Sequence, residues 1–299
     1  MKRQVAKDSL IKPVLMFLQY LDIVKGKAKG TINEYQRKIF YFLKWSSLKS
    51  WSELNKEIIW QYRVHLNDKG LNKKTQAYYL IALRNFLKYL KLQGWGVIDY
   101  HLIELPKIGE RKLNILEPKE LKRLLEAPSG TDLKSLRDKA ILETLFSTGL
   151  RLSELCSLNR DIDIEKGEIS ITGKGGRVRI VFLSPYAKKA LRAYLNERQD
   201  SHPALFISLS KNQPPQRLKP RSIEKIIKYY GKRAGILKNI TPHILRHQFA
   251  TDLLASGADL RSVQLLLGHK NLSTSQIYLH IVDKELKKIH QEFHRRRLR

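Results

Sequence analysis

The sequence predicts a mainly helical protein of two domains, the second of which also holds a small three-stranded antiparallel sheet. Apolar residues recur at three- and four-residue spacing along most of the 299 residues, which is typical of helices that bury one face. Residues 161–183 instead alternate apolar and polar positions with period two, which is typical of strands. A charged break with proline and glycine interrupts the pattern at residues 105–118. We therefore expect a helical domain at 1–108, a linker at 109–118 and a mixed domain at 119–299.

The first domain is expected to contain four helices that pack through apolar stripes. These helices are predicted at residues 10–24, 31–45, 51–69 and 72–93. In the last of them, Tyr79 and Leu83 belong to one apolar stripe. Thr31 and Glu34 have the spacing of a capping box at the start of the second helix, and Ser52 has the side chain of an N-cap for the third.

The second domain is expected to combine helices with the sheet. Strands are predicted at residues 161–164, 168–172 and 178–182, and helices at 119–125, 135–147, 185–198, 222–234 and 243–256. Thr241 and Pro242 have the residue types of an N-cap and a first helical position. A further helix is expected between the cap Asp259 and the terminating Gly268, and another is expected to carry Tyr278.

The chain is strongly basic, with a formal net charge of +29. Residues 1–105 carry a net charge of +11 and residues 106–299 carry +18. Such an excess indicates a polyanionic partner, because it would otherwise only repel itself. Nucleic acid is the first candidate and an anionic membrane surface the second. Since both halves are basic, the charge indicates a clamp around the polyanion rather than a basic tail on a neutral enzyme.

Other signals limit the class of protein. No stretch reaches the ~20 apolar residues of a membrane span, and no signal peptide follows Met1, so we expect a cytoplasmic protein. The single cysteine, Cys156, cannot form an intramolecular disulfide and is interpreted as a small core residue. The motifs of a P-loop and of a His-Glu-x-x-His zinc site are absent. We therefore expect no metal and no cofactor.

His243 and Arg246 are separated by three residues on one predicted helix, so both side chains can point at one target. The N-terminus of that helix also favours an anion such as phosphate. The alternative is a histidine and an arginine that merely lie on the surface of a basic protein.

Arg151 lies in an apolar stretch of helical pattern and needs an anionic partner there. That partner is either Glu154, three residues later, or a phosphate held by the guanidinium fork. Lys174 lies in a turn between glycines, which let a backbone approach a ligand closely, although a solvated turn lysine fits the same pattern.

His269 directly follows the helix-ending Gly268, and Tyr278 lies among apolar residues. A helix cap and a core tyrosine are the ordinary explanations of these two residues. A tyrosine has a pKa of ~10 and needs activation to attack at neutral pH, which nearby arginines provide by favouring the phenolate. If the chain acts on phosphodiesters without a metal, arginines must stabilise the developing charge.

Taken together, these motifs strongly resemble the tyrosine site-specific recombinases, or phage-integrase family. The matching segments are Thr148–Leu155 (TGLRLSEL), Gly173–Gly176 (GKGG), His243–His247 (HILRH), Leu267–His269 (LGH) and Ile277–His280 (IYLH). The resemblance implies that the helical first domain is a SAM-like core-binding domain and that the second domain is catalytic. The compact length is most similar to that of the Xer recombinases and small integrases.

The resemblance also implies roles for the candidate residues. Tyr278 would be the nucleophile that forms a 3′-phosphotyrosyl link with DNA. Arg151 and Arg246 would hold the non-bridging phosphate oxygens, and Glu154 would support them.

For the proton transfers, the resemblance implies Lys174 as the general acid on the departing 5′-oxygen. His243 would take part in acid–base transfer at the tyrosine, and His269 would hydrogen-bond the phosphate. Gln248 and Ser275 stand where serine and threonine are frequent in the family, and neither position is catalytic.

The family's assembly implies double-stranded DNA as the partner and a homotetramer on two duplexes. Residues 284–299 would dock as a helix into a neighbouring protomer, or would instead lie on DNA as a basic tail. The implied function is dimer resolution of chromosomes or plasmids through a Holliday junction, with integration, excision or inversion by a mobile element as the alternative. A type IB topoisomerase and a catalytically silent DNA-binding protein are further alternatives.

Overall fold

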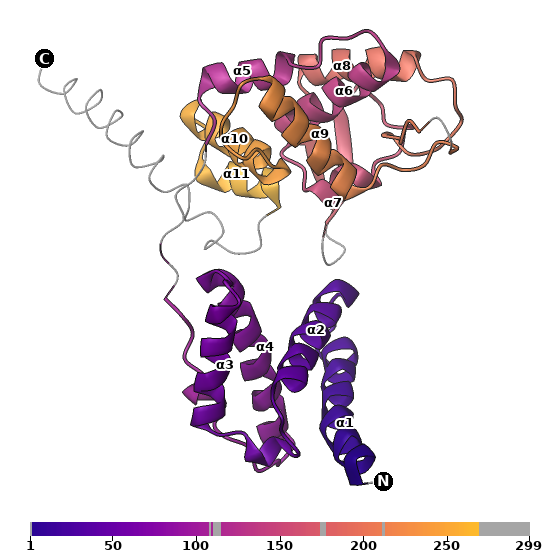
Figure 1. The fold of residues 1–299 in the computed structure, drawn as a ribbon. Coiled ribbons are helices and arrows are strands. Elements are labelled where there is room, and N and C mark those ends of the chain that lie inside the picture. Colours follow the sequence, from indigo (N-terminus) through magenta and orange to yellow (C-terminus); the bar gives the residue numbers. More distant parts are fainter. Residues whose placement is uncertain (1, 108, 110–114, 174–177, 211–212, 269–299) are drawn as a thin grey trace, which may run out of the picture. The chain divides into compact units, whose positions relative to one another are not determined.

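The computed structural model describes residues 2–107, 109, 115–173, 178–210 and 213–268 (Figure 1). The chain divides into two compact units, Met1–Arg111 and Lys112–Arg299, and each has a hydrophobic core of its own. Within the described part, no helix combines the length and the apolarity that a bilayer span requires.

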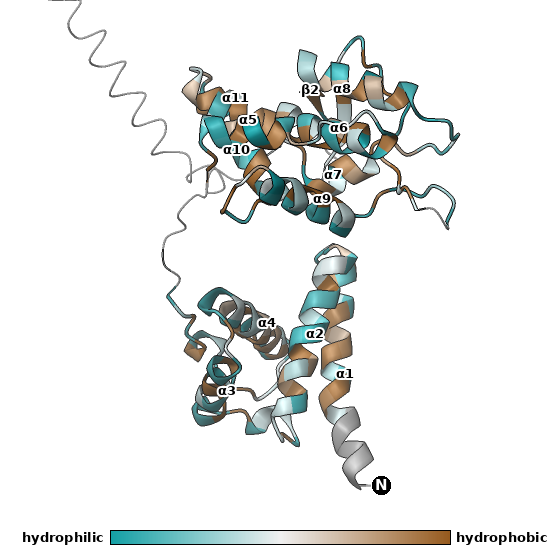
Figure 2. Ribbon diagram, turned by 45° about the horizontal axis from the view of Figure 1, so that its top comes forward, coloured by the Kyte–Doolittle hydropathy of each residue, from teal (hydrophilic) through white to brown (hydrophobic). Residues whose placement is uncertain are grey.

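Every regular element among the described residues of the first unit is a helix. Its elements are α1 (Lys2–Ile23), α2 (Lys29–Trp45), η1 (Trp51–Glu53), α3 (Lys56–Asp68), α4 (Lys73–Leu92) and η2 (Tyr100–Leu102), where η denotes a short 3₁₀ turn. The four predicted helices are therefore confirmed, with somewhat different ends. Their hydrophilic and hydrophobic faces are visible in Figure 2, as the spacing of apolar residues predicted.

Aromatic rings are the largest fully buried side chains in the core of the first unit. The ring of Trp51 packs edge-on against Phe86 at a centroid distance of 4.6 Å, and Phe86 meets Phe17 at 5.4 Å. The indole Nε1 of Trp51 also donates a hydrogen bond to the backbone carbonyl of Leu10 at 3.0 Å, which satisfies its buried polar group. Trp51 therefore connects the segment before α3 to both α1 and α4.

Two predicted helix caps of the first unit are wrong. Thr31 lies inside α2, which begins after Ala28 without a side-chain cap. Ser52 lies inside η1, and Asn55 caps α3 instead, accepting a hydrogen bond from the backbone N–H of Ile58 at 3.0 Å. The apolar pattern merged η1 with α3 because both bury apolar side chains in the same core.

The second unit combines helices with one small sheet. Its elements are α5 (Pro118–Glu126), α6 (Leu133–Thr148), α7 (Leu152–Ser157), β1 (Glu168–Thr172), β2 (Val178–Phe182), α8 (Pro185–Asn196), α9 (Pro220–Arg233), α10 (Pro242–Ala255) and α11 (Leu260–Leu267). Thr241 caps α10, Pro242 occupies its first turn and Asp259 caps α11, as predicted.

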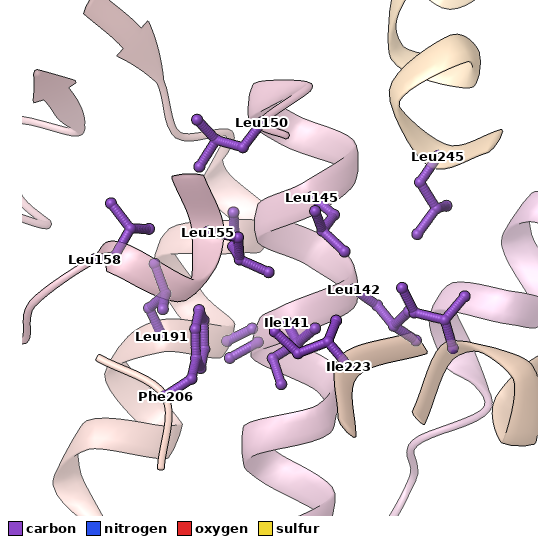
Figure 3. Packing of buried hydrophobic residues seen from close by; sticks show 14 of the residues in the cluster. Ile141, Leu142, Leu145, Leu150, Leu155, Leu158, Leu191, Phe206, Ile223 and Leu245 are labelled. Carbon is purple, nitrogen blue, oxygen red and sulfur yellow. The ribbon is translucent and has the colours of Figure 1, made fainter. Parts of the chain in front are cut away.

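Helix α6 lies at the centre of the second unit and contacts α5, α8, α9, α10 and β2 (Figure 1). Figure 3 shows part of this core, including Ile141, Leu142, Leu145, Leu155, Leu191, Phe206 and Ile223. Cys156 packs partly buried against the same core, where burial raises the pKa of its thiol to about 11. Its interpretation as a small core residue is consistent with this position.

The sheet of the second unit has two strands among the described residues, not three. β1 and β2 pair antiparallel, with Ile169 opposite Val181. The strand predicted at 161–164 is a turn instead, in which the carboxylate of Asp163 accepts a hydrogen bond from the backbone N–H of Lys166 at 2.9 Å. The period-two pattern there arises because Ile162 and Ile164 pack against the core while the aspartates stay outside.

Candidate active site at the C-terminus of helix α11

Arg151 lies between two helices, so the helical pattern in which it was expected is interrupted at this residue. α6 ends at Thr148, and Gly149 adopts the left-handed conformation with φ 58°. A Cβ at Gly149 would lie 2.4 Å from a ring carbon of Phe249, so a glycine fits this turn on both conformational and steric grounds. The turn places Arg151 as the last extended residue before α7.

The guanidinium of Arg151 has two anchors. Its Nη1 donates to Oε1 of Glu154 at 2.8 Å, and its Nη2 donates to the carbonyl oxygen of Gly268 at 3.0 Å. The backbone N–H of Arg151 also donates to Oε2 of Glu154 at 2.7 Å. The pairing with Glu154 is thus real, but a guanidinium has five N–H donors and the side chain remains 35% exposed. A phosphate contact is compatible with both anchors.

Arg246 is nearly buried, with 6% of its surface exposed, on the second turn of α10. Its Nη1 donates to the carbonyl oxygen of Gly149, and its Nη2 donates to that of Leu267 at 2.6 Å. Both acceptors are at helix C-termini, where unpaired carbonyls carry partial negative charge. The guanidinium therefore bridges the ends of α6 and α11.

Arg179 is part of the same cluster and was not predicted as a site residue. It lies on β2 and faces inward, with 11% of its side chain exposed. Its Nη1 and Nη2 donate to Oε1 and Oε2 of Glu154 at 2.9 and 2.7 Å, and its Nε donates to the carbonyl oxygen of Leu266 at 3.0 Å. The alternation of the strand contained a signal, since an arginine on the same face as the buried Val181 needs a partner.

The C-terminus of α11 thus receives one hydrogen bond from each of three arginines. Arg179, Arg246 and Arg151 donate to the successive carbonyls of Leu266, Leu267 and Gly268. These arginines come from β2, α10 and the turn before α7. The C-terminal end of α11 therefore binds three segments that are far apart in the sequence. Helix C-termini favour cations, which explains why arginines satisfy these carbonyls.

Glu154 partly balances the charge of this cluster. Burial by itself would raise the pKa of its carboxyl group, but hydrogen bonds from Arg179 and from the backbone and side chain of Arg151 lower the pKa to about 2. Glu154 is therefore ionised at neutral pH. Three guanidinium groups against one carboxylate leave the cluster positive, as binding of a phosphodiester requires.

His243 lies exposed on the first turn of α10, three residues before Arg246. The structure thus brings Arg151 and Arg246 together and places His243 on the same helix as Arg246. Lys174, His269 and Tyr278 are outside the described residues. In the sequence, Lys174 falls between β1 and β2, and His269 directly follows Gly268.

The fold and these residues agree with the protein families that the sequence matches. The phage integrase family matches residues 114–285, and the N-terminal SAM-like domain of phage integrases matches residues 14–94. The first match alone covers more than half of the chain, so the protein belongs to the phage integrase family and is a tyrosine recombinase.

Within this family the chain is similar to the Xer proteins. It is 38% identical to tyrosine recombinase XerD of Oceanobacillus iheyensis and 37% identical to tyrosine recombinase XerC of Pelotomaculum thermopropionicum. Each alignment covers 94% of this chain and 97% of the relative. Among solved structures, a post-cleavage complex of the XerH site-specific recombinase with palindromic difH DNA is 27% identical, with a TM-score of 0.70. That match covers 87% of this chain and 78% of XerH.

Proposed function

We propose that this protein is a Xer-type site-specific recombinase that cuts and rejoins double-stranded DNA through a 3′-phosphotyrosyl intermediate. The main support is the convergence of Arg151 and Arg246 on the carbonyls of Gly268 and Leu267. The two arginines are fixed next to each other on the two carbonyls that directly precede His269 in the sequence, an arrangement that suits one phosphate group. The similarity to XerD and XerC over nearly the whole chain supports the same conclusion.

In this proposal, Arg151 and Arg246 each hold a non-bridging oxygen of the scissile phosphate. Their positive charge stabilises the additional negative charge of the pentacoordinate transition state, a task that a metal ion performs in many other nucleases. The same charge favours the phenolate of Tyr278. The two arginines therefore act on both the electrophile and the nucleophile.

The phenolic oxygen of Tyr278 attacks phosphorus, and the bond from phosphorus to the 5′-oxygen breaks. His243 accepts the phenolic proton, Lys174 gives a proton to the departing 5′-oxygen, and His269 donates a hydrogen bond to the phosphate. In the reverse direction, a 5′-hydroxyl of the partner strand attacks the phosphotyrosine and releases Tyr278. The number of phosphoester bonds is conserved throughout, so rejoining needs no ATP.

We also propose the assembly that this chemistry needs. Residues 1–108 form a core-binding domain that clamps DNA together with the catalytic domain at 119–299, connected by a linker at 109–118. Both parts are basic, with net charges of +11 before residue 106 and +18 after it. Four copies on two duplexes, connected by exchange of the helix at 284–299, allow strand exchange through a Holliday junction.

Resolution of chromosome or plasmid dimers in the cytoplasm is the biological role that the XerD and XerC similarity favours. Integration, excision or inversion by a mobile element uses the same chemistry and stays the alternative. Recombination of two sites on one plasmid tests the proposal, because a Xer-type enzyme converts a head-to-tail plasmid dimer to monomers without other genes of a mobile element.

The chemistry itself is tested with a duplex that this protein selects from a randomised pool. The selected duplex is nicked in its centre, so that cleavage releases a short fragment that carries the 5′-hydroxyl. Loss of this fragment prevents rejoining and traps the covalent complex. The wild-type protein should give a protein–DNA species on a denaturing gel, with chelator present and without ATP. Tyr278→Phe should bind the same duplex and give no such species.

Two outcomes would point to the other functions. Relaxation of a supercoiled plasmid that lacks the selected site, by the protein acting as a monomer, would indicate a topoisomerase. Tight specific binding without any adduct, in the wild-type protein and at every nick position, would indicate a silent DNA-binding protein. An adduct that persists in Tyr278→Phe would show that another residue is the nucleophile.

A further inference from the structure

We propose that Arg179 is a positioning residue, which fixes the orientation of Arg151 by holding both of the groups to which Arg151 is anchored. This inference rests on the proposed role of Arg151 at the scissile phosphate. Arg179 itself is not proposed to touch DNA. Its action is transmitted through Glu154 and through the end of α11.

The first anchor of Arg151 is the carboxylate of Glu154, which lies between two guanidinium groups. Oε1 accepts from Nη1 of Arg151 at 2.8 Å and from Nη1 of Arg179 at 2.9 Å. Oε2 accepts from the backbone N–H of Arg151 and from Nη2 of Arg179, both at 2.7 Å. The planar fork of Arg179 meets both oxygens, so the carboxylate cannot rotate without breaking two charged hydrogen bonds. The direction of Glu154 toward Arg151 is thereby fixed.

The second anchor of Arg151 is the carbonyl of Gly268, and Arg179 also packs against this residue. A Cβ added to Gly268 would lie only 3.1 Å from Cδ of Arg179. The Nε of Arg179 holds the carbonyl of Leu266, two residues earlier. The same side chain therefore fixes the last turn of α11, which presents its next two carbonyls to Arg246 and Arg151.

The position of Arg179 in the fold explains why this connection matters. Arg179 belongs to β2, the strand that follows Lys174 in the sequence, and is paired with Ile171 of β1. Glu154 belongs to α7, and Leu266 belongs to α11. One side chain thus ties the small sheet to the two segments that orient Arg151. Outer partners of this kind fix reactive groups whose geometry must hold to within a fraction of an ångström.

Charge supports the same assignment. Among the described residues, the charged side chains bonded to Glu154 are Arg151, at the start of its own helix, and Arg179, from β2, while α11 presents backbone carbonyls to the cluster. Without Arg179, the buried Glu154 would lose two of its four hydrogen bonds. Burial would then favour its protonated form more strongly, and a protonated Glu154 is a poorer partner for Arg151.

The test compares Arg179→Met and Arg179→Lys with the wild-type protein on the nicked duplex selected from the randomised pool. Adduct formation is followed in single turnover with the protein in excess, from mildly acidic to alkaline pH. DNA affinity and melting temperature are measured on the same samples. Arg198→Lys is the matched control. Arg198 is also a buried guanidinium fork, and its hydrogen bonds among the described residues go to Asp200 and to the carbonyls of His202, Ala204 and Leu205, away from the arginine cluster.

We expect Arg179→Met to slow adduct formation on the order of 10- to 100-fold, the usual effect of removing such an outer partner. Its affinity for the duplex should change far less. Its rate should also fall toward acid at a higher pH than the wild-type rate does. Arg179→Lys should be intermediate, because an ammonium group can hold one carboxylate oxygen but cannot span two. Arg198→Lys should melt earlier yet keep the wild-type rate and pH profile.

The proposal is overturned if Arg179→Met forms the adduct with the wild-type rate and pH profile. It is also overturned if the loss of rate is matched by an equal loss of DNA affinity. Should Arg179→Met fail to fold, Arg179→Lys decides, and a wild-type rate and pH profile in that variant would overturn it. If the wild-type protein itself forms no adduct, the proposed function fails and this inference falls with it, an outcome distinct from a failure of Arg179 alone.

Discussion

Nη2 of Arg151 donates a hydrogen bond to the carbonyl oxygen of Gly268, 117 residues later in the sequence, at 3.0 Å. Arg246 is anchored one carbonyl earlier, on Leu267. The two proposed phosphate ligands therefore share one support, and the support is backbone at a helix end rather than a flexible side chain. Their relative position exists before DNA binds, so little reorganisation is needed when charge develops on the phosphate.

Lysine should not be able to replace the buried Arg246 in catalysis. An ammonium group cannot bridge the carbonyls of Gly149 and Leu267 and also present a fork to a phosphate. We expect Arg246→Lys to lower the rate of adduct formation about 100- to 1,000-fold, the effect of removing a preorganised donor from a transition state. Single-turnover assays on the selected nicked duplex measure this rate.

Arg217→Lys is the control for Arg246→Lys. Arg217 also donates to two backbone carbonyls, those of Cys156 and Leu158, but its contacts lie away from α11. Its replacement should lower the melting temperature and leave the rate of adduct formation unchanged. Equal losses of rate in the two variants would contradict a specific role of Arg246.

Glu154 should stabilise the fold at neutral pH and lose this effect in acid. Its pKa in the folded protein, about 2, is below the ordinary value of 4.5, so folding favours the ionised form. The contribution is complete above pH 4.5, decreases as the pH falls through this range, and is lost near pH 2. The shift corresponds to at most about 3 kcal/mol.

Urea unfolding of the wild-type protein and Glu154→Gln at several pH values measures this contribution. The difference in the free energy of unfolding should be largest near neutral pH and shrink toward acid. Glu165→Gln is the control, because Glu165 pairs with Arg192 on an exposed surface and should contribute almost nothing at any pH. A difference for Glu154→Gln that does not vary with pH would contradict the assigned pKa.

Much of the fold could be predicted from the sequence because long amphipathic helices leave a strong periodic signal. The four helices of the first unit were found, and Asp259 and Thr241 were recognised as caps. The errors occur where a short apolar stretch has two interpretations. The isoleucines of residues 161–164 point into the core from a turn, and period two alone does not distinguish that turn from a strand.

The candidate site could be predicted only in part. Arg151, His243 and Arg246 stand in motifs, so the sequence pointed to them directly. Arg179 lies outside the segments that resemble the family, and its importance depends on contacts with Glu154 and Leu266, which are 25 and 87 residues away. Such distant contacts are a property of tertiary packing. An inward-facing arginine on a strand was nevertheless a warning that a buried partner exists.

Trp51 should be a main determinant of stability in the first unit. Trp51→Phe removes the indole N–H that donates a hydrogen bond to the buried carbonyl of Leu10. We expect the free energy of unfolding to fall by about 1–3 kcal/mol. The control Trp60→Phe, at a side chain that is 60% exposed, should cost less than about 0.5 kcal/mol. Urea unfolding followed by tryptophan fluorescence measures both, and similar losses in the two variants would contradict the role of Trp51.

Replacement of Gly149 should lower both the stability of the second unit and the rate of adduct formation. In Gly149→Ala the left-handed backbone costs about 1–2 kcal/mol, and the contact of Cβ with Phe249 adds about 1–3 kcal/mol. The matched control is Gly235→Ala, which has a similar φ of 68° but open space around the added Cβ, so it should show only the backbone cost. Since the carbonyl of Gly149 holds Arg246, the first variant should also form the adduct more slowly.

Circular dichroism and fluorescence together localise the effect of Gly149→Ala. All four tryptophans belong to the first unit, at positions 45, 51, 60 and 95, so their fluorescence reports on that unit alone. Gly149→Ala should lower the midpoint seen by circular dichroism while the fluorescence midpoint stays close to that of the wild-type protein. Gly235→Ala could instead lower stability and adduct formation as much as Gly149→Ala. In that case the left-handed backbone conformation alone would explain the glycine at the end of α6, and the contact with Phe249 and the bond to Arg246 would not be needed.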